Sequence, residues 1–310
     1  MNNIKNVQAK QKKKKHISKG KKNEWIAAYI FIAPLVIGLL IFYIYPFFQN
    51  FWFSFNEVNR FNVSTFTGLE NYKTLVKDKE LFRTLGNTLK YVVITVPVGI
   101  CLSLFLAALL NTKIKGTSLY RTIFFLPSVT MSVAIALVWK WMYNGDFGIL
   151  NMVLGVFGIK GQNWLSNPKL ALYMVMIVGI WMSVGYNMII FLAGMQGISQ
   201  TYYEAAALDG AGPVKQFFKI TIPLVTPTIF FVMITSIIGG FQVFDTIYMM
   251  IGKTSLAYEK TQTLVMMFYR YAFDYGEKGY AAAISIFIFA IILLITIFQF
   301  VMQKKWINYD

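Results

Sequence analysis

The sequence predicts an all-α membrane protein that crosses the bilayer six times. Hydrophobic residues make up 57% of the 310 residues and charged residues only 14%, whereas soluble domains carry roughly 25% charged residues. Five windows exceed the ~18–20 residues that cross a bilayer and contain no Asp, Glu, Lys or Arg. They are Trp25–Asn56, Tyr91–Thr112, Leu170–Tyr203, Ile220–Phe244 and Gly279–Gln303. A sixth uncharged window, Thr122–Trp139, has 18 residues and only just reaches the required length.

Each window is interpreted as a helix, because a helix satisfies its own backbone hydrogen bonds in lipid. The expected helices lie at about residues 27–49, 89–110, 119–142, 170–197, 223–250 and 280–302. Between the fourth and fifth helices, the segment 198–222 reads as a small amphipathic helix-turn-helix outside the bilayer. The expected domains are a polybasic tail, residues 1–25, and one transmembrane domain, residues 26–310.

The distribution of Lys and Arg predicts that both ends of the chain are cytoplasmic. In this orientation the cytoplasmic segments are 1–25, 111–121, 198–222 and 303–310. They hold 16 of the 29 Lys and Arg against four acidic residues, whereas the outer segments and helix ends hold 13 against eight. An even number of helices returns the C-terminus to the cytoplasm, which suits Lys304 and Lys305.

The amino-terminal 22 residues carry nine lysines. A basic run can bind nucleic acid, but a basic tail that leads directly into a membrane helix favours anionic lipid as its partner. We therefore expect a topology and lipid anchor and no nucleic acid. The following apolar stretch is too long for a cleaved signal sequence.

The residues for several kinds of chemistry are missing from the sequence. Cys101 and His16 are the only cysteine and histidine, which excludes an intrachain disulfide, His/Cys metal sites and a His-based triad. Gly252-Lys253-Thr254 resembles the end of a phosphate-binding loop, but Ile247 stands where that loop needs glycine. The chain is therefore not expected to hydrolyse ATP, bind a metal or act as an enzyme by itself.

The segment Glu204–Pro227, EAAALDGAGPVKQFFKITIPLVTP, is the most distinctive part of the sequence. Glu204 is expected to open a helix of small residues, Gly210 to allow a tight turn or close contact, and Pro213 to start a second short helix. Pro223 and Pro227 are expected to end the patch. Small side chains beside a few charges make a docking surface for a partner.

This segment resembles the EAA loop of ATP-binding-cassette (ABC) importer permeases, which has Glu-Ala-Ala, three residues, Gly and a later Ile-x-x-Pro. Further matches to the carbohydrate-type permeases extend over about residues 25–305. They are Asn87-Thr88-Leu89, Phe125-Leu126-Pro127 with Trp139, Gly148-Ile149-Leu150-Asn151 with Trp164-Leu165, Tyr203–Ala211 and Gly279–Ala283. Phe241–Asp245 is similar to the MalF-like rather than the MalG-like subunit.

Departures from the family pattern are few. Ile222 replaces the usual Leu, and Ile251–Thr254 stands where many relatives have a Gly-Gly-Pro turn. The large outer insertion of some members is missing, since the loop at 56–86 is short.

The resemblance implies a permease subunit of a carbohydrate importer in a bacterial or archaeal cell membrane. It implies a heterodimer with a MalG-like permease, two ABC ATPase subunits that bind ATP and Mg, and an external or periplasmic solute-binding protein. The ATPase would bind the loop at 198–222, through residues Glu204, Ala205, Ala206, Asp209, Gly210 and Ala211. Glu204 would pair with an Arg of the ATPase, the alternative being that it only caps its helix.

The substrate path is expected on the polar and aromatic faces of the last three helices, because sugar hydroxyls need hydrogen-bond partners and flat apolar faces. The candidate residues are Trp181, Ser183, Tyr186, Asn187, Ser236, Gln242 and Asp245. The alternative for each is helix-to-helix bonding within the membrane, and Asp245 also fits the outer interface.

Two rival classes are left open by composition alone. An ion-coupled secondary sugar transporter would need ionisable groups within the membrane or repeated halves with broken helices, and only Asp245 qualifies. A channel-like or scaffolding protein would need no driving partner. The EAA-like loop argues against both, while the sugar itself, including a disaccharide, a longer oligosaccharide or a glycerol phosphate, stays open.

Overall fold

The computed structural model describes residues 19–58, 63–112 and 115–303. Most of the predicted lysine tail, and Lys304 and Lys305, lie outside these residues. The chain divides into two compact units, Met1–Trp52 and Phe53–Asp310, and each is described by itself.

The described part of the first unit is one long helix. It comprises α1 (Lys19–Leu39), a π-helical turn (Leu40–Ile44) and the start of α2 (Tyr45–Phe53). Its membrane-length stretch, Asn23–Phe53, is apolar on all sides. The helix predicted at 27–49 is therefore confirmed, and its surface is suited to lipid or to another protein.

The second unit starts with a small element of two strands and a helix that the sequence did not predict. Strand β1 (Asn56–Val58) pairs antiparallel with β2 (Ser64–Phe66), and α3 (Glu70–Lys77) follows. The Asn71 amide donates to the carbonyl oxygens of Ser54 and Asn56, both at 2.9 Å. The Asn56 carbonyl also lies against Gly279 so closely that a Cβ there would overlap it. These contacts fix the hairpin to the start of the last helix.

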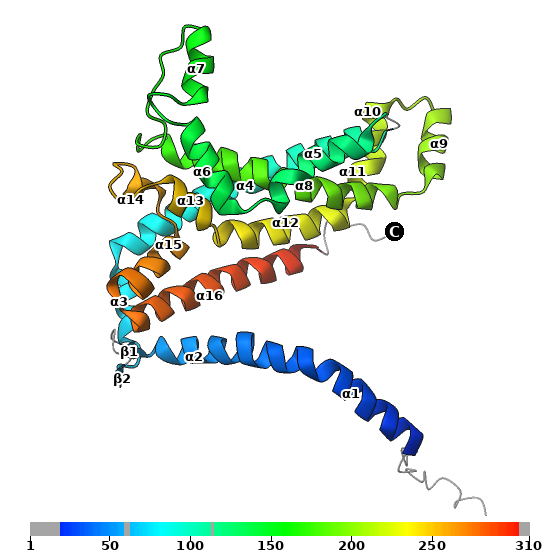
Figure 1. The fold of residues 1–310 in the computed structure, drawn as a ribbon. Helices are drawn as coiled ribbons and strands as arrows, with labels where there is room; N and C mark the ends of the chain where they lie inside the picture. Colours follow the sequence, from blue (N-terminus) through cyan, green and yellow to red (C-terminus); the bar gives the residue numbers. More distant parts are fainter. Residues whose placement is uncertain (1–18, 59–62, 113–114, 304–310) are drawn as a thin grey trace, which may run out of the picture. The chain divides into compact units, whose positions relative to one another are not determined.

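Four long helices form the body of this unit (Figure 1). They are α4 (Lys79–Leu110), α8 (Ala171–Gln196), α12 (Thr226–Phe241) and α16 (Lys278–Gln303). Helix α4 packs along α8 and α12, and α16 packs along α12. Helix α4 starts at Lys79, ten residues before its predicted position of 89, and its N-cap is Asp78, whose carboxylate accepts a hydrogen bond from the Glu80 amide at 2.8 Å. This cap explains why the helix extends beyond its apolar part.

The predicted helix at 119–142 is broken rather than continuous. Helix α5 (Thr117–Val129) and α6 (Ser132–Met142) meet at 97°. Just before the break, the hydroxyls of Ser128 and Thr130 donate to the carbonyl oxygens of Phe125 and Leu126, at 2.7 and 2.8 Å. Together with Pro127, these bonds compete with the backbone ladder of the helix, and the chain becomes extended at Thr130 and Met131.

The predicted helix at 223–250 is also interrupted. Helix α12 ends at Phe241, after Gly239 and Gly240, and α13 (Asp245–Met250) is a separate helix. Before α12 come α10 (Pro213–Gln216), a π-helical turn (Phe217–Thr221) and α11 (Ile222–Leu224). This segment, Pro213–Leu224, and α12 meet at an angle of 67°. Among the described residues, four helices are long and apolar enough to cross a membrane, or up to six if each bent pair is one span.

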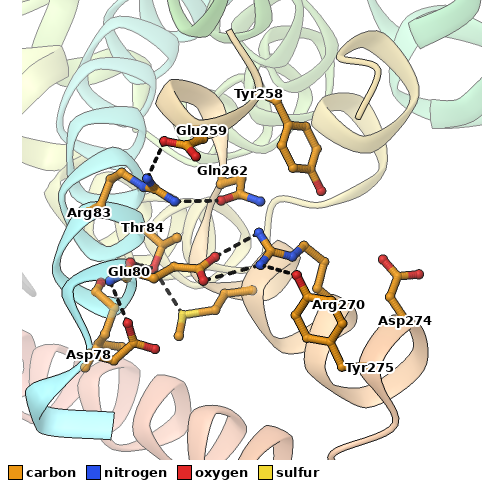
Figure 2. A network of polar contacts seen from close by, with 12 residues as sticks. Asp78, Glu80, Arg83, Thr84, Tyr258, Glu259, Gln262, Arg270, Asp274 and Tyr275 are labelled. Atoms are coloured by element: carbon orange, nitrogen blue, oxygen red, sulfur yellow. Dashed lines mark hydrogen bonds and ion pairs between the residues drawn. The ribbon is translucent and has the colours of Figure 1, made fainter. Parts of the chain in front are cut away.

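The remaining helices are α7 (Ile149–Val156), α9 (Gln200–Leu208), α14 (Tyr258–Thr261) and α15 (Leu264–Tyr269), the last followed by a π-helical turn (Arg270–Tyr275). Segment 251–278 is tied to the start of α4 by polar contacts (Figure 2).

Ion pairs form the centre of this polar network. Arg270 pairs with Glu80 at 2.9 Å, and Arg83 pairs with Glu259 at 2.6 Å. Burial, followed by the charges of Glu80 and Asp78, raises the pKa of Tyr271 to about 12. Tyr271 therefore stays neutral in the physiological range, and the ion pairs hold the start of α4 to segment 251–278.

The close contact between α8 and α5 yields a first prediction. A Cβ at Gly185 would overlap the Phe124 carbonyl, which is backbone and cannot rotate away. Gly185→Ala should therefore destabilise the protein by about 1–3 kcal/mol, measured as a lower thermal midpoint in detergent. Gly86→Ala is the matched control, because nothing lies within 4 Å of that position; it should be neutral or stabilise by up to about 1 kcal/mol. Equal effects of the two variants would contradict the packing described.

The polar network yields a second prediction. The Arg270 and Glu80 side chains are only 15% and 16% exposed, so Glu80→Gln leaves a largely buried cation unpaired and should destabilise by about 3–5 kcal/mol. Glu70→Gln removes the partner of Lys73 in a pair that is 63–66% exposed, and should change stability by about 0–1 kcal/mol. Denaturation of both variants in the same detergent checks the comparison, and a Glu80→Gln loss no larger than that of Glu70→Gln would overturn it.

Candidate functional site

The EAA loop, residues 198–222, folds as two short helices joined by a tight turn. Helix α9 begins at Ser199, whose hydroxyl accepts a hydrogen bond from the Thr201 amide at 3.4 Å. The expectation that Glu204 opens this helix is wrong, because Glu204 is the fifth residue of α9. A helix dipole acts mainly on the first turn, so Glu204 is not a capping acid and its carboxylate is free to serve another role.

The turn between the helices has the geometry that the sequence predicted for Gly210. Gly210 has a left-handed φ of +74°, which glycine adopts without strain. The amide of Ala211 donates to the Ala206 carbonyl at 2.8 Å, and that of Gly210 donates to the Ala207 carbonyl at 3.0 Å. This pair of bonds is a Schellman motif. Pro213 then starts α10, as expected.

Space does not explain the glycine, since nothing lies within 4 Å of a Cβ built at Gly210. The backbone conformation is what requires it. Any larger residue at this position would strain the turn without touching the rest of the chain.

One face of the loop is exposed and carries apolar side chains. Leu208 is 91% exposed and Val214 is 72% exposed, while Glu204, Ala205 and Asp209 are exposed between them. Ala206 and Ala211 are half-buried. Below this face, the Tyr203 hydroxyl is hydrogen-bonded to the Thr221 hydroxyl at 3.0 Å, and the Gln216 amide donates to the Ala211 carbonyl at 2.9 Å. These two bonds hold the halves of the loop together, while its exposed face is left open.

A polar cavity of about 370 Å³ lies between α4, α8 and α12. It brings together four predicted residues, Ser183, Tyr186, Asn187 and Ser236. The Asn187 amide donates to the Ser236 hydroxyl across the α8–α12 contact at 3.5 Å. The other lining residues are Tyr91, Thr95, Val96, Gly99, Ser128, Gly179, Met182, Thr235, Gly239, Gly240, Val243 and Thr246.

Three predicted residues are not in this lining. Trp181 packs edge-to-face on Trp139, with ring centroids 5.6 Å apart. Gln242 is the C-cap of α12. Asp245 starts α13 and accepts a hydrogen bond from the Ser132 hydroxyl at 2.7 Å, so its carboxylate joins α13 to α6.

The sequence reasoning missed the contribution of α4, because it placed the substrate path on the last three helices alone. Its polar and small residues form one buried stripe at helical spacing, namely Thr84, Thr88, Tyr91, Thr95, Gly99 and Ser103. A polar stripe of this length in an otherwise apolar membrane helix indicates a face turned to the interior. That spacing was readable in the sequence.

Metal binding finds no support in the described part of the chain, where no group of three or more His, Cys, Asp or Glu side chains could hold an ion. The chemistry of the lining is that of hydroxyls, one amide and small apolar groups. Such a set can bind a solute by hydrogen bonds but provides no nucleophile with an adjacent base.

Comparisons with known proteins agree with the helical fold and the EAA loop described above. Residues 99–308 match the family model described as "Binding-protein-dependent transport system inner membrane component". The chain is 35% identical over 288 residues to the probable ABC transporter permease protein YesP of Bacillus subtilis (strain 168), covering 92% of this chain and 93% of that protein.

Two further relatives are similar over most of their length. The sn-glycerol-3-phosphate transport system permease protein UgpA of Escherichia coli (strain UTI89 / UPEC) is 31% identical, covering 93% of this chain and 97% of that protein. The arabinooligosaccharides transport system permease protein AraP of Bacillus subtilis (strain 168) is 33% identical, covering 87% and 86%.

A solved structure shares the fold. It is a chain of a bacterial ABC transporter involved in the import of the acidic polysaccharide alginate, with a TM-score of 0.83 and 23% identity, covering 93% of this chain and 98% of that one. The resemblance drawn from the EAA loop and its companion motifs is confirmed, and the chain belongs to the family of binding-protein-dependent transport system inner membrane components.

Proposed function

We propose that this chain is the MalF-like permease subunit of an ABC importer that moves a carbohydrate or related polyol into the cell. The single observation that carries the proposal is the match of the family model over residues 99–308, which include the complete EAA loop. The chain is a non-catalytic membrane component of the transporter. ATP and Mg are bound by the separate ATPase subunits and no cofactor is expected here.

The named substrates of relatives support a carbohydrate as cargo. UgpA is named for sn-glycerol-3-phosphate and AraP for arabinooligosaccharides. The solved transporter with the same fold has also been crystallised with a periplasmic protein that holds an alginate pentasaccharide. An external solute-binding protein is therefore the expected donor of substrate to this chain as well.

The proposed complex contains this chain, a MalG-like permease subunit and two ATPase subunits. The EAA loop would receive the ATPase, with Leu208 and Val214 as apolar contacts and Glu204 as the partner of a basic side chain. Short, charge-assisted contacts around an apolar centre are typical of such interfaces. In the membrane orientation predicted from the distribution of Lys and Arg, the loop and both chain ends would be cytoplasmic, and the lysine tail would lie on anionic lipid.

The connections of the EAA loop suggest how it transmits motion. Helix α9 follows α8 after only three residues, and the loop continues through α11 into α12. Helices α8 and α12 also line the polar cavity, together with α4 and single residues of α5 and α13. Movement of the loop by the ATPase would therefore move two walls of the cavity as stiff bodies.

The ion-coupled secondary transporter remains the alternative. It would need a titratable group in the substrate path, and the cavity lining has no Asp, Glu, Lys, Arg or His among the described residues. Asp245 is bonded to Ser132 at the edge. These observations favour a transporter that is driven by a separate ATPase.

A third prediction tests the coupling role of the EAA loop. Gly210→Leu should strain the left-handed turn, and Glu204→Lys should reverse the charge presented to the ATPase. Both variants should insert normally but lose ATPase attachment or uncouple hydrolysis from uptake, while Glu204→Ala should weaken attachment by only about 1–3 kcal/mol. Pull-down and uptake are measured on the same preparations.

Gly158→Leu is the matched control for the Gly210 variant. Gly158 has a similar φ of +71° and equally open surroundings, but it follows α7, outside the loop. It should assemble and transport like the unmodified chain. Normal assembly and uptake by both Gly210→Leu and Glu204→Lys would show that residues 198–222 do not couple the ATPase.

A fourth prediction tests dependence on partners. The isolated chain in liposomes should neither hydrolyse ATP nor concentrate sugar, because the described residues supply no titratable group in the cavity to use an ion gradient. Uptake is measured with and without imposed proton and sodium gradients, and the complete transporter serves as the positive control. Gradient-driven uptake by the chain alone would favour the secondary transporter.

A further inference from the structure

The charge of the substrate is the question that the relatives leave open. One relative is named for a phosphate ester and another for arabinooligosaccharides, and the solved transporter imports an acidic polysaccharide. The polar cavity between α4, α8 and α12 bears on this question, because every one of its described lining residues is uncharged. An anion in a membrane-embedded site needs a cation or several strong donors to replace its hydration.

The hydroxyls of the cavity are already oriented by their own helices. The hydroxyl of Thr95 donates to the Tyr91 carbonyl at 2.8 Å, and that of Ser183 donates to the Ile180 carbonyl at 2.9 Å. The Thr235 hydroxyl donates to the Phe231 carbonyl at 3.0 Å. Ser128 donates in the same way to the Phe125 carbonyl. With their protons engaged, these four groups offer only oxygen lone pairs to a solute.

Lone pairs discriminate between classes of solute. A neutral saccharide has many hydroxyl donors and can bond to them, while a carboxylate or phosphate has no proton to offer and is repelled. The other donors in the lining are neutral: the Asn187 amide and the hydroxyls of Tyr91, Tyr186, Ser236 and Thr246. Met182, Val96 and Val243 add apolar surface that suits the faces of a sugar ring.

The charged groups nearest along the chain do not help an anion. Lys90 precedes Tyr91, but its ammonium lies over the ring of Tyr173, 4.2 Å from the centroid. Lys140 donates to the Met249 carbonyl at 3.2 Å. Asp245, beside the lining residue Thr246, adds negative charge at the edge.

We propose that this cavity selects a neutral, hydroxyl-rich saccharide and disfavours saccharides that carry a carboxylate or phosphate. The inference rests on the proposed function, since it assumes that the cavity lies on the substrate path. It adds the chemical class of the substrate, which family membership does not supply. The cavity volume of about 370 Å³ is near the lower end of the ~300–1,000 Å³ of ligand sites, so it would hold a short part of a chain.

The test places a charge of either sign in the cavity of the complete transporter. Thr235 is an exposed lining residue in the isolated chain, and Thr235→Asp and Thr235→Lys are compared with the nearly isosteric Thr235→Val. Thr122→Asp and Thr122→Lys are the matched controls, because Thr122 is likewise an exposed residue, in α5, with the same type of hydroxyl bond, to the Ser118 carbonyl, and lies outside the lining. Uptake and stimulated ATPase are measured with the binding protein and a panel of neutral saccharides, uronates and sugar phosphates.

For a neutral substrate, the two charges should impair uptake alike, each by about tenfold or more, because both must be desolvated in the cavity. The Thr122 variants should stay within about threefold of the unmodified transporter, because they change no lining residue. Thr235→Val removes one acceptor hydroxyl but adds no charge, so its loss of uptake should be smaller than that of either charge variant. Only neutral saccharides should stimulate the ATPase.

Uptake of a uronate or sugar phosphate that survives Thr235→Lys but is lost in Thr235→Asp would overturn the inference, while leaving the importer assignment intact. Equal, near-normal uptake by both Thr235 charge variants would show that the cavity is not on the path, which also overturns it. If no saccharide of any charge stimulates the assembled complex, the proposed function itself fails, and the inference fails with it.

Discussion

The structure depends on one constraint: backbone that leaves a helix at membrane depth must find other hydrogen-bond partners. Two helices of the second unit are broken, at Thr130–Met131 and at Gln242–Phe244. Their outer halves, α6 and α13, pack on each other and are joined by the Ser132–Asp245 bond and by Lys140 on the Met249 carbonyl. The polar cavity borders both breaks, with Ser128 on one side and Val243 and Thr246 on the other.

This arrangement gives the cavity two kinds of wall. The walls formed by α4 and α8 are continuous helices, held at short distance by glycines such as Gly179, where a Cβ would overlap the Tyr91 hydroxyl. The remaining wall is segmented, because α5 and α12 end beside the cavity and the helices that follow them, α6 and α13, are joined to each other by the Ser132–Asp245 and Lys140–Met249 contacts. Solute binding and conformational change therefore have a natural location in the part of the fold that regular secondary structure does not fix.

The sequence predicted the location of the long helices and the tight turn of the EAA loop, because both follow from local rules. Apolar length determines a membrane helix, and the spacing of Gly210 and Pro213 determines the turn. The helix breaks were not predicted. They depend on competing hydroxyl–carbonyl bonds of Ser128 and Thr130 and on contacts with α13, which an apolar run conceals.

Site residues were predicted less completely for a similar reason. Ser183, Tyr186, Asn187 and Ser236 line the cavity, but Asp245 is bonded to Ser132 and Trp181 is stacked on Trp139. Polarity alone does not distinguish a residue that faces solute from one that faces another helix. Glu204 does not open its helix as expected, because Ser199, five residues earlier, caps α9.

The ion pair between Glu80 and Arg270 has a consequence for the order in which contacts form during synthesis. Its two partners are 190 residues apart in the chain, so Glu80 leaves the ribosome long before Arg270 has been made. Until Arg270 has been made, the Glu80 carboxylate at the start of α4 lacks this partner and stays hydrated. Only when segment 251–278 has been made can Arg270 cover this charge. The contacts at the start of α4 are therefore completed after the helices that line the cavity have been synthesised.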